Sequence, residues 1–200
     1  MTPTRADRML IEAAMPRFDA VITEHTVVGA DVHTTFAAAR SLDLLTVRTP
    51  LVLASMWLRN VPVRLLGAPP PPARQLILSE AGTMPGWLVL GERADREIAF
   101  GAVGKFWQPV IEWRDVPRDE FAGFAEPGWG KIAANLSTIP YGEGSTLLSY
   151  ECRTVTTDPG SRKRFQRYWW LIRPFVGHIM RATRQKVRSD AQAVSRPRSR

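Results

Sequence analysis

The sequence predicts an α+β fold in which a run of antiparallel strands precedes one long C-terminal helix. Two observations predict it. From 161 to 191, large apolar residues recur every three or four positions, which is the spacing of an amphipathic helix. Between 87 and 157, segments of strand-like composition are separated by turn residues. A helix of this length reaches about 45 Å, so we expect a broad, curved sheet beneath its apolar face.

The C-terminal helix is expected to bury one face and to bend. Its apolar face comprises Phe165, Trp169, Ile172, Val176, Ile179, Thr183 and Val187. Bases occupy the positions between these residues, and Arg164 and Arg184 are expected on the outer face. Pro174 lacks the amide that would bond back one turn, and its ring crowds the preceding turn. A kink is therefore predicted near Ile172, loosened further by Gly177.

The remaining elements follow from alternating patterns and turn residues. Strand-like segments run over 18–28, 87–92, 97–103, 104–106, 109–116, 131–139 and 145–157. The last two are joined by a turn over 140–144, rich in residues that tolerate unusual backbone angles. A helix is predicted over 32–40 with Asp31 as its N-cap, and a second over 51–58 opened by Pro50.

Composition and length indicate one globular domain. The chain has 200 residues, of which 44% are hydrophobic and 23% charged. Residues 1–17 are interpreted as an N-terminal extension, 18–191 as the domain and 192–200 as a disordered basic tail. The single cysteine, Cys152, cannot form an internal disulfide, and no uncharged apolar run is long enough to cross a bilayer. With no signal-peptide pattern in the first residues, the expected location is cytoplasmic.

The net charge of +8 is concentrated near the C-terminus. From 160 onward there are 12 Lys or Arg and one acid, Asp190, whereas residues 1–159 carry 15 bases and 18 acids. The preferred interpretation is a solvated, Arg-rich outer face of the long helix. An alternative is peripheral contact with an anionic membrane through that helix, and nucleic acid is the less favoured partner.

Polar side chains in two strands are the candidates for chemistry. Glu151 and Arg153 alternate along the last strand and share one face, where they can pair or orient a polar head group. His25 in the first strand is a candidate general base, since imidazole changes protonation near neutral pH. Each also has a purely structural interpretation. His33 and His178 have no partners at metal-ligand spacing, so no metal and no cofactor are expected.

Several short motifs carry a resemblance to a known family. They are Pro16-Arg17-Phe18-Asp19 leading to Glu24-His25, Asn60-Val61-Pro62-Val63-Arg64-Leu65-Leu66-Gly67, Gly104-Lys105-Phe106-Trp107, Tyr150-Glu151-Cys152-Arg153-Thr154 and Ser161-Arg162-Lys163-Arg164-Phe165-Gln166-Arg167-Tyr168-Trp169. Together with the order of elements, the chain resembles the SRPBCC superfamily, also called START-like or helix-grip proteins. Within it, the likeness is to actinobacterial proteins labelled polyketide cyclase/dehydrase or lipid-transport-like. The resemblance implies a seven-stranded antiparallel sheet wrapped around the C-terminal helix, with two short helices after the first strand.

The resemblance also implies a function. Its fold holds a hydrophobic cavity between sheet and helix, so we expect a hydrophobic or lipid-like small molecule to bind there. The residues expected to line that cavity are Trp107, Tyr150, Trp169, Ile172 and Val176. One alternative is an enzyme of cyclase or dehydratase type in the same cavity, using His25 with Glu151 and Arg153. A second is an interaction module that uses the Arg-rich helix. The sequence leaves open the ligand, the oligomeric state and the face of the last strand that lines the cavity.

Overall fold

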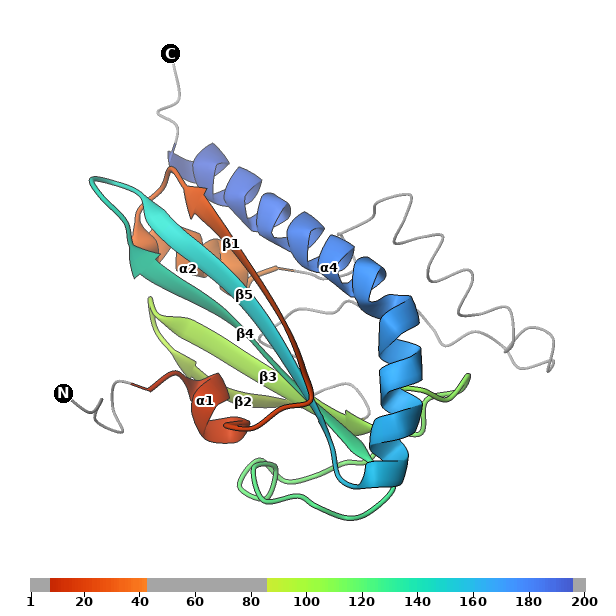
Figure 1. The fold of residues 1–200 in the computed structure, drawn as a ribbon. Helices are drawn as coiled ribbons and strands as arrows, with labels where there is room; N and C mark the ends of the chain where they lie inside the picture. The colour runs from red at the N-terminus through yellow and green to blue at the C-terminus, as the bar shows by residue number, and fades with distance from the viewer. Residues whose placement is uncertain (1–7, 43–85, 196–200) are drawn as a thin grey trace.

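The computed structural model describes residues 8–42 and 86–195, and it has the predicted α+β class. Figure 1 shows a sheet flanked by helices, with one long helix running along one side. In chain order the elements are α1 (Leu10–Ala14), β1 (Ala20–Val28), α2 (Val32–Arg40), β2 (Trp87–Arg93), β3 (Glu97–Gly104), β4 (Gly130–Pro140), β5 (Thr146–Thr156) and α4 (Pro159–Ser195).

The sheet is antiparallel throughout, with strand order β1-β5-β4-β3-β2. The first strand therefore pairs with the last one, and β1 lies at one edge of the described sheet. The β4–β5 turn contains Gly142 and Gly144 at φ 68° and 63°, left-handed angles that glycine adopts without steric cost. This confirms the turn that the sequence predicts.

Five of the predicted strands are present, and two predictions are wrong. Segment 109–116 forms no strand, because only a single bridge, Gly104 to Trp113, links it to β3. Residues 104–106 are not a separate strand either, since Gly104 ends β3. The predicted helix over 51–58 lies outside the described residues, and the described sheet has five strands and not the seven that the resemblance implies.

Strand alternation gives the sheet two buried faces. One face packs on α2 and α4 around an apolar cluster of Val28, Ala30, Ala39, Leu42, Ile98, Phe100, Ala134, Leu136, Leu148, Tyr150, Met180, Val187 and Ala191. The opposite face is covered by α1 and the loop before β4, around Ile11, Met15, Leu90, Ala99, Val103, Phe121, Trp129 and Ala133. Residues 10–14, predicted within an N-terminal extension, are therefore packed against the sheet.

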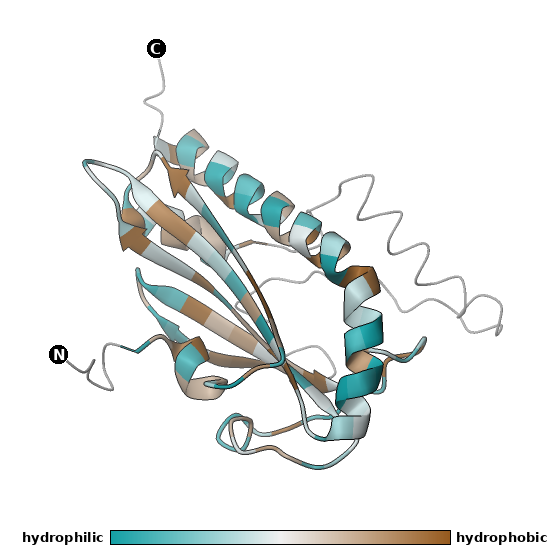
Figure 2. Cartoon of the chain, viewed as in Figure 1, coloured by the Kyte–Doolittle hydropathy of each residue, from teal (hydrophilic) through white to brown (hydrophobic). Residues whose placement is uncertain are grey.

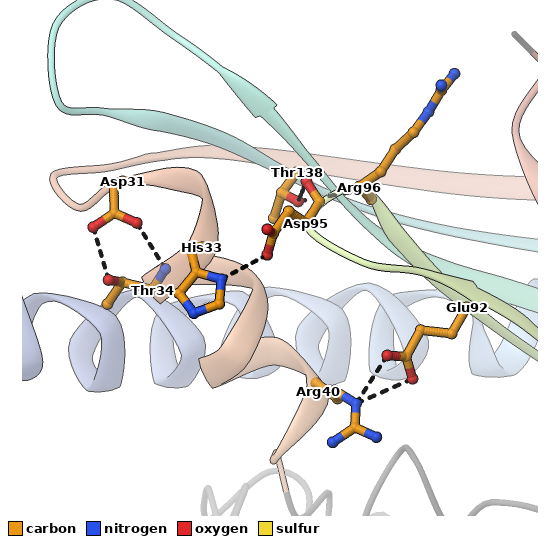
Figure 3. Close-up of polar contacts among 8 residues, drawn as sticks. All are labelled: Asp31, His33, Thr34, Arg40, Glu92, Asp95, Arg96 and Thr138. Atoms are coloured by element: carbon orange, nitrogen blue, oxygen red, sulfur yellow. Dashed lines mark hydrogen bonds and ion pairs between the residues drawn. The ribbon is translucent and has the colours of Figure 1, made fainter.

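Helix α2 is capped and tied to the β2–β3 hairpin, as Figure 3 shows. The Asp31 carboxylate accepts from the Thr34 amide at 2.8 Å, so the predicted N-cap is confirmed. His33 Nδ1 lies 3.0 Å from the Asp95 carboxylate, and Arg40 Nε donates to Glu92 at 2.9 Å. These contacts are exposed, so each contributes little to stability.

Helix α4 begins where Asp158 accepts hydrogen bonds from the amides of Ser161 and Gly128, at 2.9 and 2.7 Å. It continues to Ser195, so residues 192–195 of the predicted tail are helical. Its buried residues are Ser161, Phe165, Gly177, Met180, Thr183, Val187 and Ala191. Met180, and not the predicted Ile179, is the fully buried residue where α4 packs on the helix-side core. Ile179 is half-buried.

The predicted bend in α4 is present. Figure 1 shows that the two arms of the helix run in different directions. Pro174 lies inside the helix and supplies the physical reason. We call residues 159–173 the first arm and residues 175–195 the second arm. Figure 2 shows hydrophilic and hydrophobic residues alternating along both arms, as expected for an amphipathic helix. Within the described chain, no helix combines the length and apolar character needed to cross a bilayer.

The prediction that Arg184 lies on the outer face of α4 is wrong. Its side chain is only 12% exposed and donates to the Glu24 carboxylate at 3.0 Å and to the His25 carbonyl. Arg181 also contacts Glu24, at 3.3 Å. Arg184 turns inward because the half-buried carboxylate of Glu24 on the edge strand β1 faces α4, whereas Arg181 stays exposed. Arg164 is exposed, as predicted.

Replacing Phe165 should test how the first arm is anchored. Phe165 is 2% exposed, so Phe165→Ala should lower the free energy of unfolding by about 3–5 kcal/mol. Trp169 is half-buried beside it, with ring centroids 5.6 Å apart, so Trp169→Ala should cost less. Arg164→Ala is the control and should change stability by no more than about 0.5 kcal/mol. Urea denaturation of the three variants gives the comparison, and equal midpoints for Phe165→Ala and the control would contradict the packing.

Stability should fall in acid through two carboxylates that contact the first turn of α4, Asp158 and Asp19. The neighbouring Ser161 hydroxyl and the amides of Ser161 and Gly128 lower the pKa of Asp158 to about 2. Burial alone would raise the pKa of Asp19, but hydrogen bonds from Arg162 and Thr156 lower it overall. A carboxyl with a lowered pKa in the folded state stabilises the fold above its unfolded pKa and loses that effect as pH falls.

We therefore expect the urea midpoint to drop between about pH 4 and pH 2. Asp158→Asn should lower the midpoint at neutral pH and make its dependence on pH shallower over this window. An identical pH profile for the variant and the parent protein would show that Asp158 does not carry this effect.

Candidate functional site

A groove of about 500 Å³ lies between the edge strand β1 and the bend of α4. Its lining residues are Val21, Ile22, Thr23, Glu24, Arg173, Pro174, Gly177 and Arg181. The volume falls within the range of about 300–1,000 Å³ that is usual for small-molecule sites. One wall is therefore a strand and the other is a helix where its regular hydrogen bonding is interrupted.

Two residues of α4 keep this space open. Pro174 bends the helix, and Gly177 contributes no side chain. A Cβ built at Gly177 would meet only Arg181 Nη1, at 3.9 Å. A larger residue at this position would therefore project into the groove, although Gly177 itself is buried. Glycine inside a helix costs about 1 kcal/mol relative to alanine, so the open space is obtained at the expense of helix stability.

The lining of the groove combines apolar and charged side chains. Val21, Ile22 and Pro174 supply apolar surface, whereas Arg173 and Arg181 supply cations. Arg181 pairs with Glu24 at 3.3 Å. Arg173 is exposed, and no carboxylate among the described residues pairs with it. The described lining contains two cations and one anion, so it favours a ligand that has both an apolar part and a negative charge.

None of the five residues predicted to line a cavity is among the described lining residues of this groove. Tyr150 is buried in the helix-side core, and burial raises the pKa of its hydroxyl. Val176 packs against the same core, while Ile172 and Trp169 are half-buried on the first arm. Trp107 follows β3 and packs beside Gly130.

Sequence reasoning missed the groove residues for an identifiable reason. It selected large aromatic and aliphatic residues for the cavity that the resemblance implies, whereas the groove is formed by the absence of a side chain at Gly177 and by the exposed base Arg173. The pattern did single out Pro174 and Gly177 as the cause of a bend. Ile22 and Glu24 alternate with His25 in the first strand, and the sequence alone does not say which face meets α4.

The three candidate catalytic residues come together on the other face of the sheet. His25, Glu151 and Arg153 line a pocket of about 150 Å³ with Met9, Ile11, Glu12, Thr23, Asn135, Ser137, Ile139 and Ser149. Tyr150 and Cys152 point toward α4, so alternation turns Glu151 and Arg153 away from it. This pocket is therefore separate from the groove.

Within this second pocket, the contacts of Arg153 are structural. Its Nε donates to Glu151 at 2.5 Å, and its Nη1 donates to the Met15 carbonyl at 2.8 Å, just beyond the end of α1. At the opposite end of α1, the Leu10 amide donates to both oxygens of Glu97, at 3.0 and 2.9 Å. Glu97 is fully buried. Opposite charges thus satisfy the free amide and carbonyl groups at the two ends of this short helix.

The remaining polar groups supply limited chemistry. His25 Nδ1 lies 2.7 Å from the Ser149 hydroxyl, and this contact is exposed. Burial, with a smaller effect of nearby Glu151, raises the pKa of the Cys152 thiol to about 12, so it stays protonated at neutral pH and is not a ready nucleophile. No group of three or more His, Cys, Asp or Glu in residues 8–42 and 86–195 is arranged to hold a metal ion.

Arg153→Ala should therefore destabilise the fold, because it removes a donor to α1 and leaves Glu151 without its partner. We expect a loss of about 2 kcal/mol and faster amide hydrogen exchange in residues 10–15. Arg17→Ala, which changes an exposed arginine, is the matched control. Unchanged urea stability and exchange in Arg153→Ala would show that Arg153 does not hold α1.

Comparisons with known proteins give distant structural likenesses only. No protein-family model matches the chain, and no curated protein matches it. Three solved structures cover most of it. They are the hypothetical protein jhp0584 from Helicobacter pylori (12% identity, 98% of this chain and 99% of that chain, TM-score 0.40), CalU16 from Micromonospora echinospora (13%, 88% and 88%, 0.29) and TTHA0849 from Thermus thermophilus (10%, 88% and 100%, 0.32). TM-scores below 0.5 do not establish a shared fold, so the architecture rests on the chain's own elements.

Proposed function

We propose that this protein binds an amphipathic, lipid-like small molecule in the groove between β1 and α4. The observation that carries the proposal is the groove itself, which lies where Pro174 and Gly177 interrupt a long helix beside an edge strand. Its position between sheet and C-terminal helix agrees with the helix-grip architecture that the sequence motifs resemble. Sequestration or transport of the bound molecule would follow from such a site.

The lining supports a ligand with an apolar chain and an anionic head. Ile22 and Val21 of β1 offer apolar surface to the chain. Arg173 at the rim has a guanidinium with no carboxylate partner in the described residues, and such a group binds carboxylate or phosphate in a bidentate way. Arg181 already pairs with Glu24, so Arg173 is the better candidate for the head group.

The enzyme alternative finds less support in the geometry. A cyclase or dehydratase would need His25, Glu151 and Arg153 at the substrate, but these residues face away from the groove. Arg153 is also occupied with Glu151 and the Met15 carbonyl. Binding without catalysis is therefore the function that the described residues favour.

Filling the groove at Gly177 tests the proposal directly. Gly177→Leu should weaken binding of a fluorescent long-chain fatty acid at least tenfold, because the new side chain occupies the groove. Gly177→Ala is the matched control: it should keep the affinity and stabilise the helix by about 1 kcal/mol. Titration of the fatty acid into each purified variant measures both affinities. Equal binding by Gly177→Leu and the parent protein, or no binding by either, would contradict the proposal.

A second variant separates head-group recognition from chain binding. Arg173→Gln should weaken the fatty acid at least tenfold, because a hydrogen bond to a charged group contributes about 1.5–3 kcal/mol. It should leave a neutral alcohol of the same chain length nearly unchanged. An equal loss for the acid and the alcohol would remove Arg173 from the role of head-group ligand.

A further inference from the structure

The first arm of α4 exposes two large apolar residues that are consecutive in the chain. Trp170 is 82% exposed and Leu171 is 58% exposed, although both lie in the middle of a packed helix. Neither lines the groove described above. Single exposed apolar residues are common on protein surfaces, whereas here a tryptophan and a leucine follow one another in a basic segment.

Basic residues surround these two on the same side of the helix. Lys163, Arg167 and Trp170 follow the i, i+4, i+7 spacing and so form one stripe on the helix surface. Arg173 and Arg164 flank that stripe. Phe165 and Ile172 lie on the opposite side, turned toward the protein. We call the exposed set of Lys163, Arg164, Arg167, Trp170, Leu171 and Arg173 the basic face.

The charges of the basic face are not used inside the protein. No carboxylate in residues 8–42 or 86–195 pairs with Lys163, Arg164, Arg167 or Arg173. The second arm differs, because Arg181 and Arg184 pair with Glu24, and Lys186 pairs with Asp190 at 2.5 Å. On the second arm, Arg181, Arg184 and Lys186 thus have carboxylate partners within the fold, whereas the four bases of the basic face carry uncompensated positive charge toward solvent.

We propose that the basic face of α4 docks on the surface of an anionic lipid bilayer. Lysine and arginine would contact the lipid head groups, and Trp170 with Leu171 would enter the boundary between head groups and acyl chains. Tryptophan favours this boundary because it has a large apolar ring and one polar N–H group. The combination of basic residues with a tryptophan and an aliphatic side chain is typical of helices that lie in this interface.

A bilayer fits these residues better than nucleic acid does. Both are anionic, and an aromatic ring can stack on an unpaired base. Leu171, however, has no role in contacting phosphates, whereas a membrane buries it. Docking would also bring the groove rim toward the lipid, since Arg173 belongs to both. That link rests on the proposed ligand function, but the docking itself does not.

Sedimentation of the full chain with vesicles tests the docking. Vesicles of phosphatidylcholine with about 30% phosphatidylserine should bind the protein, and pure phosphatidylcholine vesicles should not. The double variant Lys163→Gln/Arg167→Gln should bind about 30-fold more weakly, since each base near an anionic surface contributes about 1 kcal/mol. Trp170→Ser should bind about tenfold more weakly. Raising the salt concentration should weaken binding by the parent protein.

Two matched controls keep the test specific. Arg188→Gln removes an exposed base from the second arm, and Tyr141→Ser removes an exposed aromatic residue from the β4–β5 turn. Figure 1 places that turn at the far end of the molecule from the first arm. Both controls should bind like the parent protein, and circular dichroism should show all variants folded.

Each contrary outcome overturns the proposal. Absence of binding to anionic vesicles does so, as does binding that Trp170→Ser and the double variant leave unchanged. Binding to single-stranded DNA in place of vesicles, lost in the double variant, would assign the basic face to nucleic acid. Because fatty-acid binding is measured separately without vesicles, failure of docking and failure of the groove proposal are distinguishable.

Discussion

The architecture of the candidate site depends on one missing hydrogen-bond donor, the amide that Pro174 lacks. In an unbroken helix the residue at 174 would donate to the carbonyl of Trp170, and its side chain would not crowd the preceding turn. Without that donor, α4 bends, and its two arms meet the protein differently. The second arm packs on α2 and the sheet around Met180 and Val187. The first arm is anchored by Phe165 and presents most of its surface outward.

Charged residues have different partners on the two sides of the sheet. On the face covered by α1, Glu97 and Arg153 satisfy opposite ends of that helix, so their charges stabilise the fold. On the side of α4, Glu24 pairs with two arginines of the second arm, whereas Arg173 has no carboxylate partner among the described residues. A charged residue in a strand of this protein is therefore no indication of catalysis by itself.

The groove and the basic face are adjacent parts of one segment. Arg173 lies in the first arm and at the rim of the groove, and Pro174 forms the bend between the arms. A protein that takes an amphipathic molecule from a membrane needs its binding site near the surface that contacts the lipid. The bend places both features within the same few residues of α4, without any additional domain.

Local sequence patterns were sufficient to predict the five strands of the described sheet and the helices α2 and α4. Period-two alternation and glycine-rich turns located β1 to β5 within a few residues, and the apolar repeat located α4 and its bend, because these signals are local. The prediction of which α4 residues are buried was less accurate. Met180 is buried where Ile179 was expected to be, and Arg184, expected on the outer face, pairs with Glu24. Segment 109–116 has strand-like composition but lacks a partner along its length, which no local pattern reveals.

Contacts between elements that are far apart in the chain determine which residues share a site. Strand alternation predicted that Glu151 and Arg153 lie on one face of the sheet. Only the packing of α4 on the opposite face shows that theirs is the face covered by α1. The groove depends on Gly177 lying opposite β1, and the basic face depends on which bases find carboxylate partners in other elements. Such features arise from contacts between residues far apart in the chain, so residue type and spacing cannot specify them.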